Sequence, residues 1–440
     1  MSDHSKIHKP KPISGFPEWL PEYRAVELRW LDNIRAVFES YGFCSIETSI
    51  VEEVDALLAK GGETEKEIYV LNRLQADDEK GEARLALHFD LTVPMARYVA
   101  QNFGSLVFPF KRYQIQKSYR GERPQKGRYR EFYQCDIDVV NVDSLPLHFD
   151  AELPAVLYRA YQSLDIPPVK IHINNRKIVI GFLQGLGITD TGLVTRTLDK
   201  TDKIGKDAVR KILAENGISP DAAQKTQALA EIKTSDASFA DKVRTLGVSH
   251  PLLEDGLSEL IFVINNLSHL PKEAVLADLG IIRGLDYYTG TVLEVRFQDS
   301  ATFGSMSIGG GGRYDDLASS FIHQKLPGIG VSIGLTRLFG LLLDNGYIKP
   351  GAKSPAGVLV VLPDESRRAE ATTTANILRA RGYKVEMYHR DAKVKNQIAY
   401  AEKKGIPFVW FPPFKDGQPH EIKDMTSGEQ KNTTPEEWKP

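Results

Sequence analysis

The chain has 440 residues, enough for two or three domains that each bury their own core. Its content of 42% hydrophobic and 26% charged residues is typical of a globular protein that folds in water. The formal net charge of −2 excludes a broad electrostatic grip on nucleic acid, so any such contact must come from a local basic patch.

Cysteine content and apolar runs exclude further classes of protein. Cys44 and Cys135, the two cysteines, make neither a disulfide framework nor a zinc site, and we expect both to be reduced. No apolar run approaches the roughly 18 residues that a membrane span needs. The start MSDHSKIHKPKP lacks the apolar stretch of a secretory signal. We therefore expect a cytoplasmic protein without a membrane span.

The first regular element predicted is a long amphipathic helix. Between Pro21 and Tyr41, apolar residues recur at three- and four-residue steps, and Gly42 ends the pattern. A strand over 43–51 is expected to follow.

Residues 68–75 and 83–90 alternate like the two strands of a hairpin. Asp90 and Thr92 then share a face at the start of a further helix, where they fit a helix cap.

The stretch from Lys111 to Val140 predicts two antiparallel strands joined by a loop at 124–127. Its first twenty residues contain eight basic side chains and one acidic one, Glu122, so they form a local basic patch. From Arg130 onward the sequence alternates.

One face of this second strand carries Phe132, Gln134, Asp136 and Asp138. An aromatic ring, an amide and two carboxylates make a poor core but a plausible pocket floor. A solvated, charged hairpin is the alternative interpretation.

After this hairpin we predict a helix over 150–164 and a strand over 169–174. Helical patterns with Asp, Lys and Ala on their faces fill 177–270, which indicates a separate helical insertion. Strands return at 277–282 and 291–297.

Glycines dominate the next two segments. Gly328, Gly330 and Gly334 space a strand against whose bare backbone a flat ligand can lie, and Arg337 opens the helix that follows. The run at 309–312 is either a strand or a flexible turn. Neither segment has the spacing of a P-loop or of a Rossmann fingerprint.

The last part of the chain predicts a small unit with a mostly parallel sheet covered by helices. Its elements are strands at 358–362, 383–387 and 407–411 and helices at 365–381 and 392–404.

The run RGERPQKGRYREFYQCDID at 120–138 closely resembles motif 2 of the histidyl-tRNA synthetase family, within the class II aminoacyl-tRNA synthetases. HFDLTVP, RGLDYYTG, GGGGRYD and IKDMTSGEQ resemble further segments of the same family, in the same order. The helix and strand of 21–51 resemble motif 1, and the glycine strand with Arg337 resembles motif 3. The resemblance covers nearly the whole chain.

This resemblance implies an α+β fold: a class II synthetase antiparallel sheet with helices, a helical insertion, and a C-terminal α/β anticodon-binding domain. The implied boundaries are 1–176 and 271–348 for the two parts of the catalytic domain, 177–270 for the insertion and 355–440 for the anticodon-binding domain. Three residues depart from the family's usual pattern: Ser49 replaces proline, Asp316 glycine and Thr336 glutamate.

The implied function is that of a histidine–tRNA ligase, which forms histidyl-adenylate and pyrophosphate from histidine and ATP and then transfers histidine to the 3′ end of tRNA(His). Mg²⁺ accompanies ATP, and no protein side chain is assigned to it. The family also implies a homodimer built on motif 1.

By resemblance, Arg120 and Arg283 are catalytic, with Arg120 holding the α-phosphate. The residues implied to bind ATP are Arg120, Glu122, Arg128, Phe132 and Arg337. Those implied to bind histidine are Asp90, Thr92, Gln134, Asp138, Arg283, Tyr287, Tyr288 and Tyr314. Those implied to meet the tRNA acceptor end are Arg123, Gln125 and Lys126.

The main alternative is a synthetase-like regulatory subunit of ATP phosphoribosyltransferase. Such subunits share the catalytic fold but usually lack the anticodon domain and lose active-site residues. This chain keeps Arg120, Gln134, Asp138, Arg283 and Arg337 and has the extra α/β unit, which favours the ligase.

Overall fold

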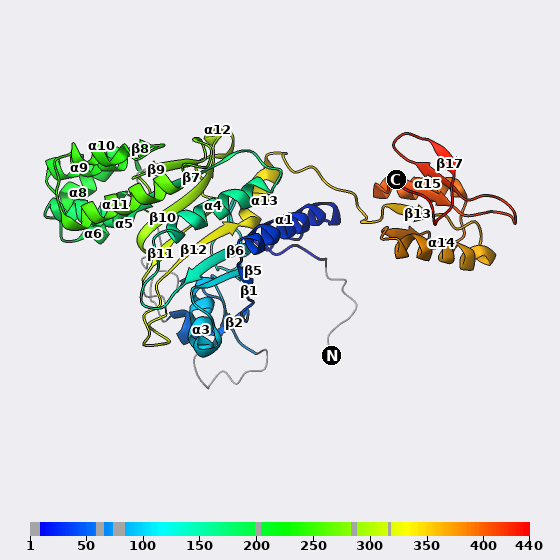
Figure 1. The fold of residues 1–440 in the computed structure, drawn as a ribbon, viewed down its shortest axis with the longest axis horizontal. Coiled ribbons are helices and arrows are strands. Elements are labelled where there is room, and N and C mark those ends of the chain that lie inside the picture. The colour runs from blue at the N-terminus through cyan, green and yellow to red at the C-terminus, as the bar shows by residue number, and fades with distance from the viewer. Residues whose placement is uncertain (1–8, 59–65, 74–83, 199–203, 283–287, 316–317) are drawn as a thin grey trace. The chain divides into compact units, whose positions relative to one another are not determined.

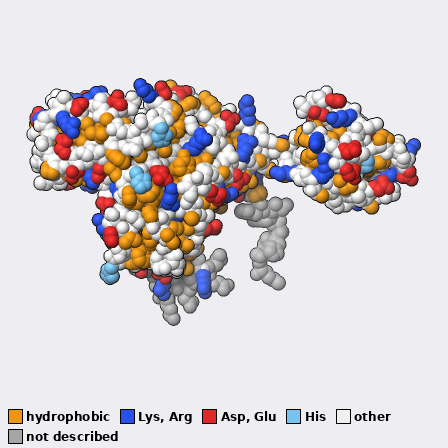
Figure 2. All heavy atoms as spheres, viewed as in Figure 1, with side chains coloured by type: hydrophobic (Ala, Val, Ile, Leu, Met, Phe, Trp, Pro, Cys, Tyr) orange, Lys and Arg blue, Asp and Glu red, His pale blue; other side chains and the backbone are white. Residues whose placement is uncertain are grey.

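The computed structural model describes residues 9–58, 66–73, 84–198, 204–282, 288–315 and 318–440. The chain divides into two compact units: a larger one that includes 30–347 and a smaller one of 348–440 together with 18–29. Among the described residues, no helix is both long and apolar enough to cross a membrane. Figure 2 shows acidic and basic side chains interspersed over the visible surface, as the small net charge leads one to expect.

The larger unit is built on a nine-stranded sheet of order β1-β5-β6-β12-β11-β10-β7-β9-β8 (Figure 1). The six strands from β5 to β7 in this order pair antiparallel throughout, which confirms the expected antiparallel sheet. The strands are β1 Cys44–Ser45, β5 Phe110–Tyr119, β6 Glu131–Val140, β12 Gly328–Gly334, β11 Gly309–Tyr314, β10 Tyr288–Phe297, β7 Val169–Asn175, β9 Val275–Asp278 and β8 Lys233–Thr234.

The sheet has one apolar face and one polar face in its middle. On β6, Cys135, Ile137 and Val139 are wholly buried, while Asp136 and Asp138 alternate with them. Helix α13 (Leu335–Asp344) packs on β6, and α4 (Phe149–Gln162) packs on β12 and β7. The run at 309–312 is a strand, so the flexible-turn interpretation was wrong.

Helix α1 (Pro21–Ser40) confirms the amphipathic pattern. Trp30, Ile34 and Phe38 are buried along one stripe, and Gly42, at φ 77°, ends the helix in a conformation that side chains other than glycine rarely adopt. The continuous strand expected over 43–51 was wrong.

The chain instead forms β1 and then β2 (Val51–Glu53) in a different, three-stranded sheet. Between them, Gln114 donates a hydrogen bond to the Thr48 hydroxyl and Gln116 donates one to the Thr48 carbonyl. Side chains thus take hydrogen bonds that a strand partner would otherwise supply. The expected hairpin completes this small sheet with β3 (Val70–Leu71) and β4 (Leu85–Leu87).

The segment after β7 is helical, as expected, and its helices gather beyond β7 in Figure 1. Gly181 and Gly256 let the first and last of these helices meet, since a Cβ at either would lie within 2.6 Å of the other helix's backbone. Strand β8 joins this segment to the main sheet. The helices are α5 Arg176–Gly185, α6 Thr191–Leu198, α8 Lys206–Glu215, α9 Pro220–Ala230, α10 Phe239–Arg244 and α11 Pro251–Asn266.

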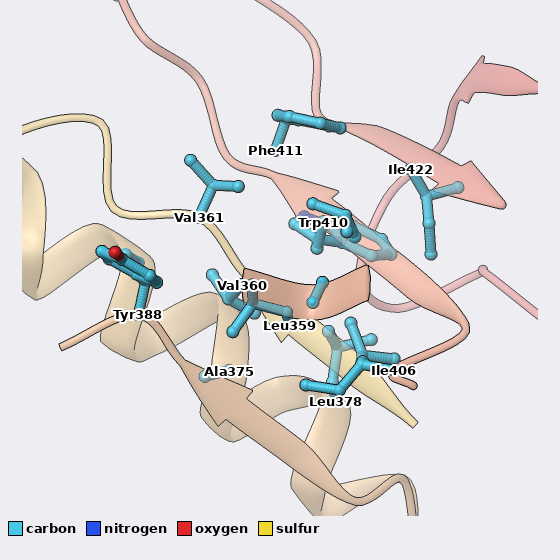
Figure 3. Close-up of a cluster of buried hydrophobic side chains, with 14 of the residues drawn as sticks. Leu359, Val360, Val361, Ala375, Leu378, Tyr388, Ile406, Trp410, Phe411 and Ile422 are labelled. Atoms are coloured by element: carbon cyan, nitrogen blue, oxygen red, sulfur yellow. The ribbon is translucent and has the colours of Figure 1, made fainter. Parts of the chain in front are cut away.

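The smaller unit has a five-stranded sheet of order β14-β13-β15-β16-β17, of which the first three strands are parallel. Figure 3 shows Leu359 and Val360 of the central strand packed beside Trp410. Trp438, near the end of the chain, also packs on this core. The elements are β13 Val358–Val360, α14 Arg368–Ala380, β14 Val385–Met387, α15 Val394–Lys404, β15 Phe408–Phe411, β16 Glu421–Asp424 and β17 Gln430–Asn432.

Candidate active site

Two adjoining pockets lie on the polar face of the main sheet. The residues that line the first include Arg120, Glu122, Arg128, Phe132, Gln134 and Arg337. Those that line the second include Asp90, Thr92, Gln134, Asp138, Tyr288 and Tyr314. Arg120 and Gln134 line both. The structure thus brings the sequence-predicted ATP set together in one pocket and the described histidine set in the next.

The first pocket is cationic. Arg120 donates a hydrogen bond from Nε to the Phe89 carbonyl at 3.0 Å, and its guanidinium lies 5.2 Å from the Phe132 ring centre. Arg337 is fixed by hydrogen bonds to the carbonyls of Gly127 at 2.8 Å and Ser307 at 2.9 Å. Burial, together with Arg120 and Arg128, lowers the pKa of Arg337. Such a pocket favours an anionic ligand, and fixed guanidinium groups suit phosphate.

Glu122 balances part of this charge. Its carboxylate lies 2.8 Å from Arg128 and 4.0 Å from Arg120. Three arginines therefore face this pocket with one carboxylate among them. No group of three or more His, Cys, Asp or Glu side chains suited to a metal ion occurs among the described residues.

The second pocket is acidic. Asp138 is 3% exposed; its Oδ1 accepts a hydrogen bond from the Tyr314 hydroxyl at 2.9 Å, and its Oδ2 lies 2.5 Å from Arg112. Burial raises the pKa of Asp138, and Arg112 opposes that effect. Asp90, whose pKa burial also raises, caps the next helix by accepting from the Val93 amide at 3.1 Å.

Bare backbone forms the floor of both pockets. Gly310 lines both of them, and Gly330 lines the second. A Cβ on Gly330 would lie 2.0 Å from Asp138 Oδ1, so only glycine leaves that carboxylate its place. The prediction of a glycine-lined site beside the β6 carboxylates is consistent with this arrangement.

The tip of the β5–β6 hairpin borders a third, wider cleft. Gln125 and Lys126 line it together with Lys206 and Arg296, whereas Arg123 is exposed on the loop. Arg283 and Tyr287 lie outside the described residues, as does Asp316.

Sequence reasoning missed three polar residues that shape the site. Arg112 stands directly opposite Asp138 in the β5–β6 pairing, Asp136 lines the second pocket, and Ser332 lines both. The hairpin register was the available signal: a hairpin turning near Gln125 pairs position 112 with position 138. Thr336, one of the three departures, accepts a hydrogen bond from the Tyr133 amide at 2.8 Å and so fastens α13 to β6.

Comparison with known proteins agrees with this geometry. The model of the family described as Histidyl-tRNA synthetase matches residues 15–338, and that of the Anticodon binding domain matches 357–439. A histidine–tRNA ligase of Thermobifida fusca is 58% identical over 98% of this chain and 99% of its own, and one of Micrococcus luteus is 46% identical over 97% and 96%.

Solved structures show the same. A histidyl-tRNA synthetase from Nostoc sp. PCC 7120 matches with a TM-score of 0.87 and 37% identity over 98% of this chain and 97% of its own. A Bacillus halodurans protein described as an ATP phosphoribosyltransferase regulatory subunit/histidyl-tRNA synthetase shares the fold at 22% identity and a TM-score of 0.74, over 90% and 97%. The chain belongs to the histidyl-tRNA synthetase family.

Proposed function

We propose that this chain is a histidine–tRNA ligase. It joins histidine to ATP, releasing pyrophosphate, and transfers histidine from the adenylate to the 3′ end of tRNA(His). The observation that carries the proposal is the pair of adjoining pockets, one cationic and one acidic, that share Arg120 and Gln134. An amino acid in the second pocket can present its carboxylate to a nucleotide in the first only at such a junction.

In the first pocket, Arg120 holds the α-phosphate, while Glu122 and Arg128 position the rest of ATP. Phe132 and Arg337 enclose the adenine or the terminal phosphate. Adenylate formation mainly requires positioning and neutralisation of the phosphate charge, which these guanidinium groups supply. Mg²⁺ would neutralise the pyrophosphate; because it prefers phosphate and water ligands, the single carboxylate Glu122 is compatible with it.

In the second pocket, Asp90, Thr92 and Gln134 hold the amino group of histidine. Asp138, Tyr288 and Tyr314, with Tyr287, form the compartment for its ring. Arg283 contacts both the α-phosphate and the histidine carboxylate, and it stabilises the negative charge that grows as the carboxylate attacks phosphorus.

For tRNA, Arg123, Gln125 and Lys126 receive the acceptor end beside the wide third cleft, and the C-terminal unit binds the anticodon. The domain boundaries proposed are 1–176 with 271–348, 177–270 and 355–440. The protein acts as a homodimer through α1 and the strand after it, in the cytoplasm where its tRNA is. Light scattering tests the assembly, and a stable single-chain mass at micromolar concentration contradicts it.

Histidine-dependent exchange of labelled pyrophosphate into ATP tests the activity. The ligase gives exchange that needs histidine, whereas a regulatory subunit gives none above background. The intact cationic pocket and the anticodon-binding unit support the first outcome.

A further inference from the structure

Asp136 is a buried carboxylate with one uncommitted oxygen in the second pocket. Its side chain is 4% exposed, it lines that pocket, and its Oδ1 has no hydrogen-bond partner. A buried acceptor without a partner costs free energy, which is why nearly all such atoms in folded proteins are paired. An unpaired oxygen in a ligand-sized pocket therefore points to a donor on the ligand.

The neighbouring carboxylate is already engaged. Both oxygens of Asp138 are occupied, one by the Tyr314 hydroxyl and the other by the Arg112 guanidinium. Asp138 therefore has less capacity than Asp136 to accept a new N–H.

Position along β6 indicates which part of the substrate Asp136 meets. Gln134 lines both pockets, so it marks the end where the amino acid must place its carboxylate. Asp136 lies two residues further on, about 7 Å deeper at the usual strand rise. It faces Ser332 across β12, and the deeper pocket beyond holds Gly330 and Tyr314. That distance matches the reach from an amino acid's backbone to the ring of its side chain.

We propose, on the basis of the ligase function above, that Asp136 determines specificity for histidine by accepting the ring N–H of the substrate imidazole on its free Oδ1. Arg112, Asp138 and Tyr314 then act as the fixed wall that holds the ring in place. A neutral imidazole offers one N–H donor, and an imidazolium offers two, so either form supplies what the oxygen lacks.

The charges around Asp136 make this contact sensitive to pH. Burial raises the pKa of Asp136 to about 7; Asp138 and Asp90 act in the same direction, while Arg112 and a hydrogen bond with Ser332 oppose it. From β5 it faces Gln114 and Arg112, and from β12 it faces Ser332. Above pH 7 the carboxylate accepts the ring N–H, and below it the protonated carboxyl competes as a donor.

The test compares Asp136→Asn with wild type and with the control Asp207→Asn, which removes a charge from a 99% exposed side chain on α8. In the exchange assay, Asp136→Asn should raise the KM for histidine about tenfold or more, because an amide donor replaces a charged acceptor. The KM for ATP should stay within about twofold, and the control should match wild type.

A second readout reports the ring itself. With histidine labelled with ¹⁵N in the ring and bound to the full chain, the NMR shifts of the ring nitrogens should differ between wild type and Asp136→Asn and should move with pH near 7 in wild type. An unchanged KM with identical shifts overturns the proposal while leaving the ligase function standing. If wild type neither binds labelled histidine nor shows exchange, the proposed function itself fails.

Discussion

Arg112 is the buried cation behind the acidic pocket, and replacing it tests how the site is held together. Arg112 is wholly buried and lies 2.5 Å from Asp138. In Arg112→Met, a side chain of similar length fills part of the space, but the carboxylate of Asp138 loses its counter-charge. Since burial already raises the pKa of Asp138 and Arg112 opposes that effect, the pKa should rise further.

The cost follows from breaking one side of a buried pair, which typically destabilises a protein by about 3–5 kcal/mol. That is a large part of the roughly 5–15 kcal/mol by which domains are stable. The histidine KM should rise too, although Arg112 lines neither pocket, because Asp138 is free to turn away from its present position.

The assay is urea unfolding at pH 7 beside histidine-dependent pyrophosphate exchange. Lys111→Met is the matched control: Lys111 is the preceding residue of the same strand and lies 2.5 Å from Glu152, but both side chains are about a quarter exposed. Such a solvated pair contributes at most about 1 kcal/mol. The reasoning is refuted if Arg112→Met destabilises the protein no more than Lys111→Met does.

Three other substitutions test separate parts of the site. Arg283→Ala should slow adenylate formation about 10²–10³-fold, as the loss of one oxyanion donor does, and spare transfer from preformed adenylate; rapid quench separates the steps, and a change of only a few-fold makes Arg283 structural. Asp136→Asn should stabilise the protein at pH 8 by up to about 4 kcal/mol and hardly at pH 4. The native carboxyl, with its pKa raised from 3.8 to about 7, keeps a proton that the unfolded chain releases in that window, so wild-type stability falls as pH rises. Equal melting temperatures of wild type and Asp136→Asn at pH 8 contradict this. Gly127→Ala places a Cβ at φ 71° and 2.6 Å from the Met306 sulfur, so it should cost about 1–2 kcal/mol and raise the KM for ATP, since Arg337 bonds to the Gly127 carbonyl; unchanged exchange kinetics argue against that coupling.

Much of the site could be predicted because it lies on strands whose alternation is visible in the sequence. Phe132, Gln134, Asp136 and Asp138 share one face by the period of two, and in the structure all four line the two pockets. The glycine strand was predicted for the same reason: residues without a side chain at ligand-facing positions leave a gap that only a ligand or a neighbouring side chain fills.

Arg112 shows why the rest could not be predicted. Its sequence neighbours Lys111 and Lys117 are partly exposed and pair with glutamates, so all three were counted in one basic patch. Whether a basic residue is buried depends on what stands across the sheet, and no local pattern contains that. The same limit explains the interrupted strand at 43–51, where glutamines of β5 bind the backbone and side chain of Thr48.

The four consecutive glycines of β11 limit how this enzyme's specificity can change during evolution. A Cβ at Gly309, Gly310, Gly311 or Gly312 would lie 2.7 Å or less from a carbonyl oxygen of a neighbouring strand. Such a collision cannot be relieved by turning a side chain, so any point mutation there breaks the sheet before it reshapes the ligand's compartment. A variant library aimed at other amino acids should leave these codons untouched and diversify the walls, where Asp136, Ser332 and Tyr288 can be exchanged without moving the backbone beneath them.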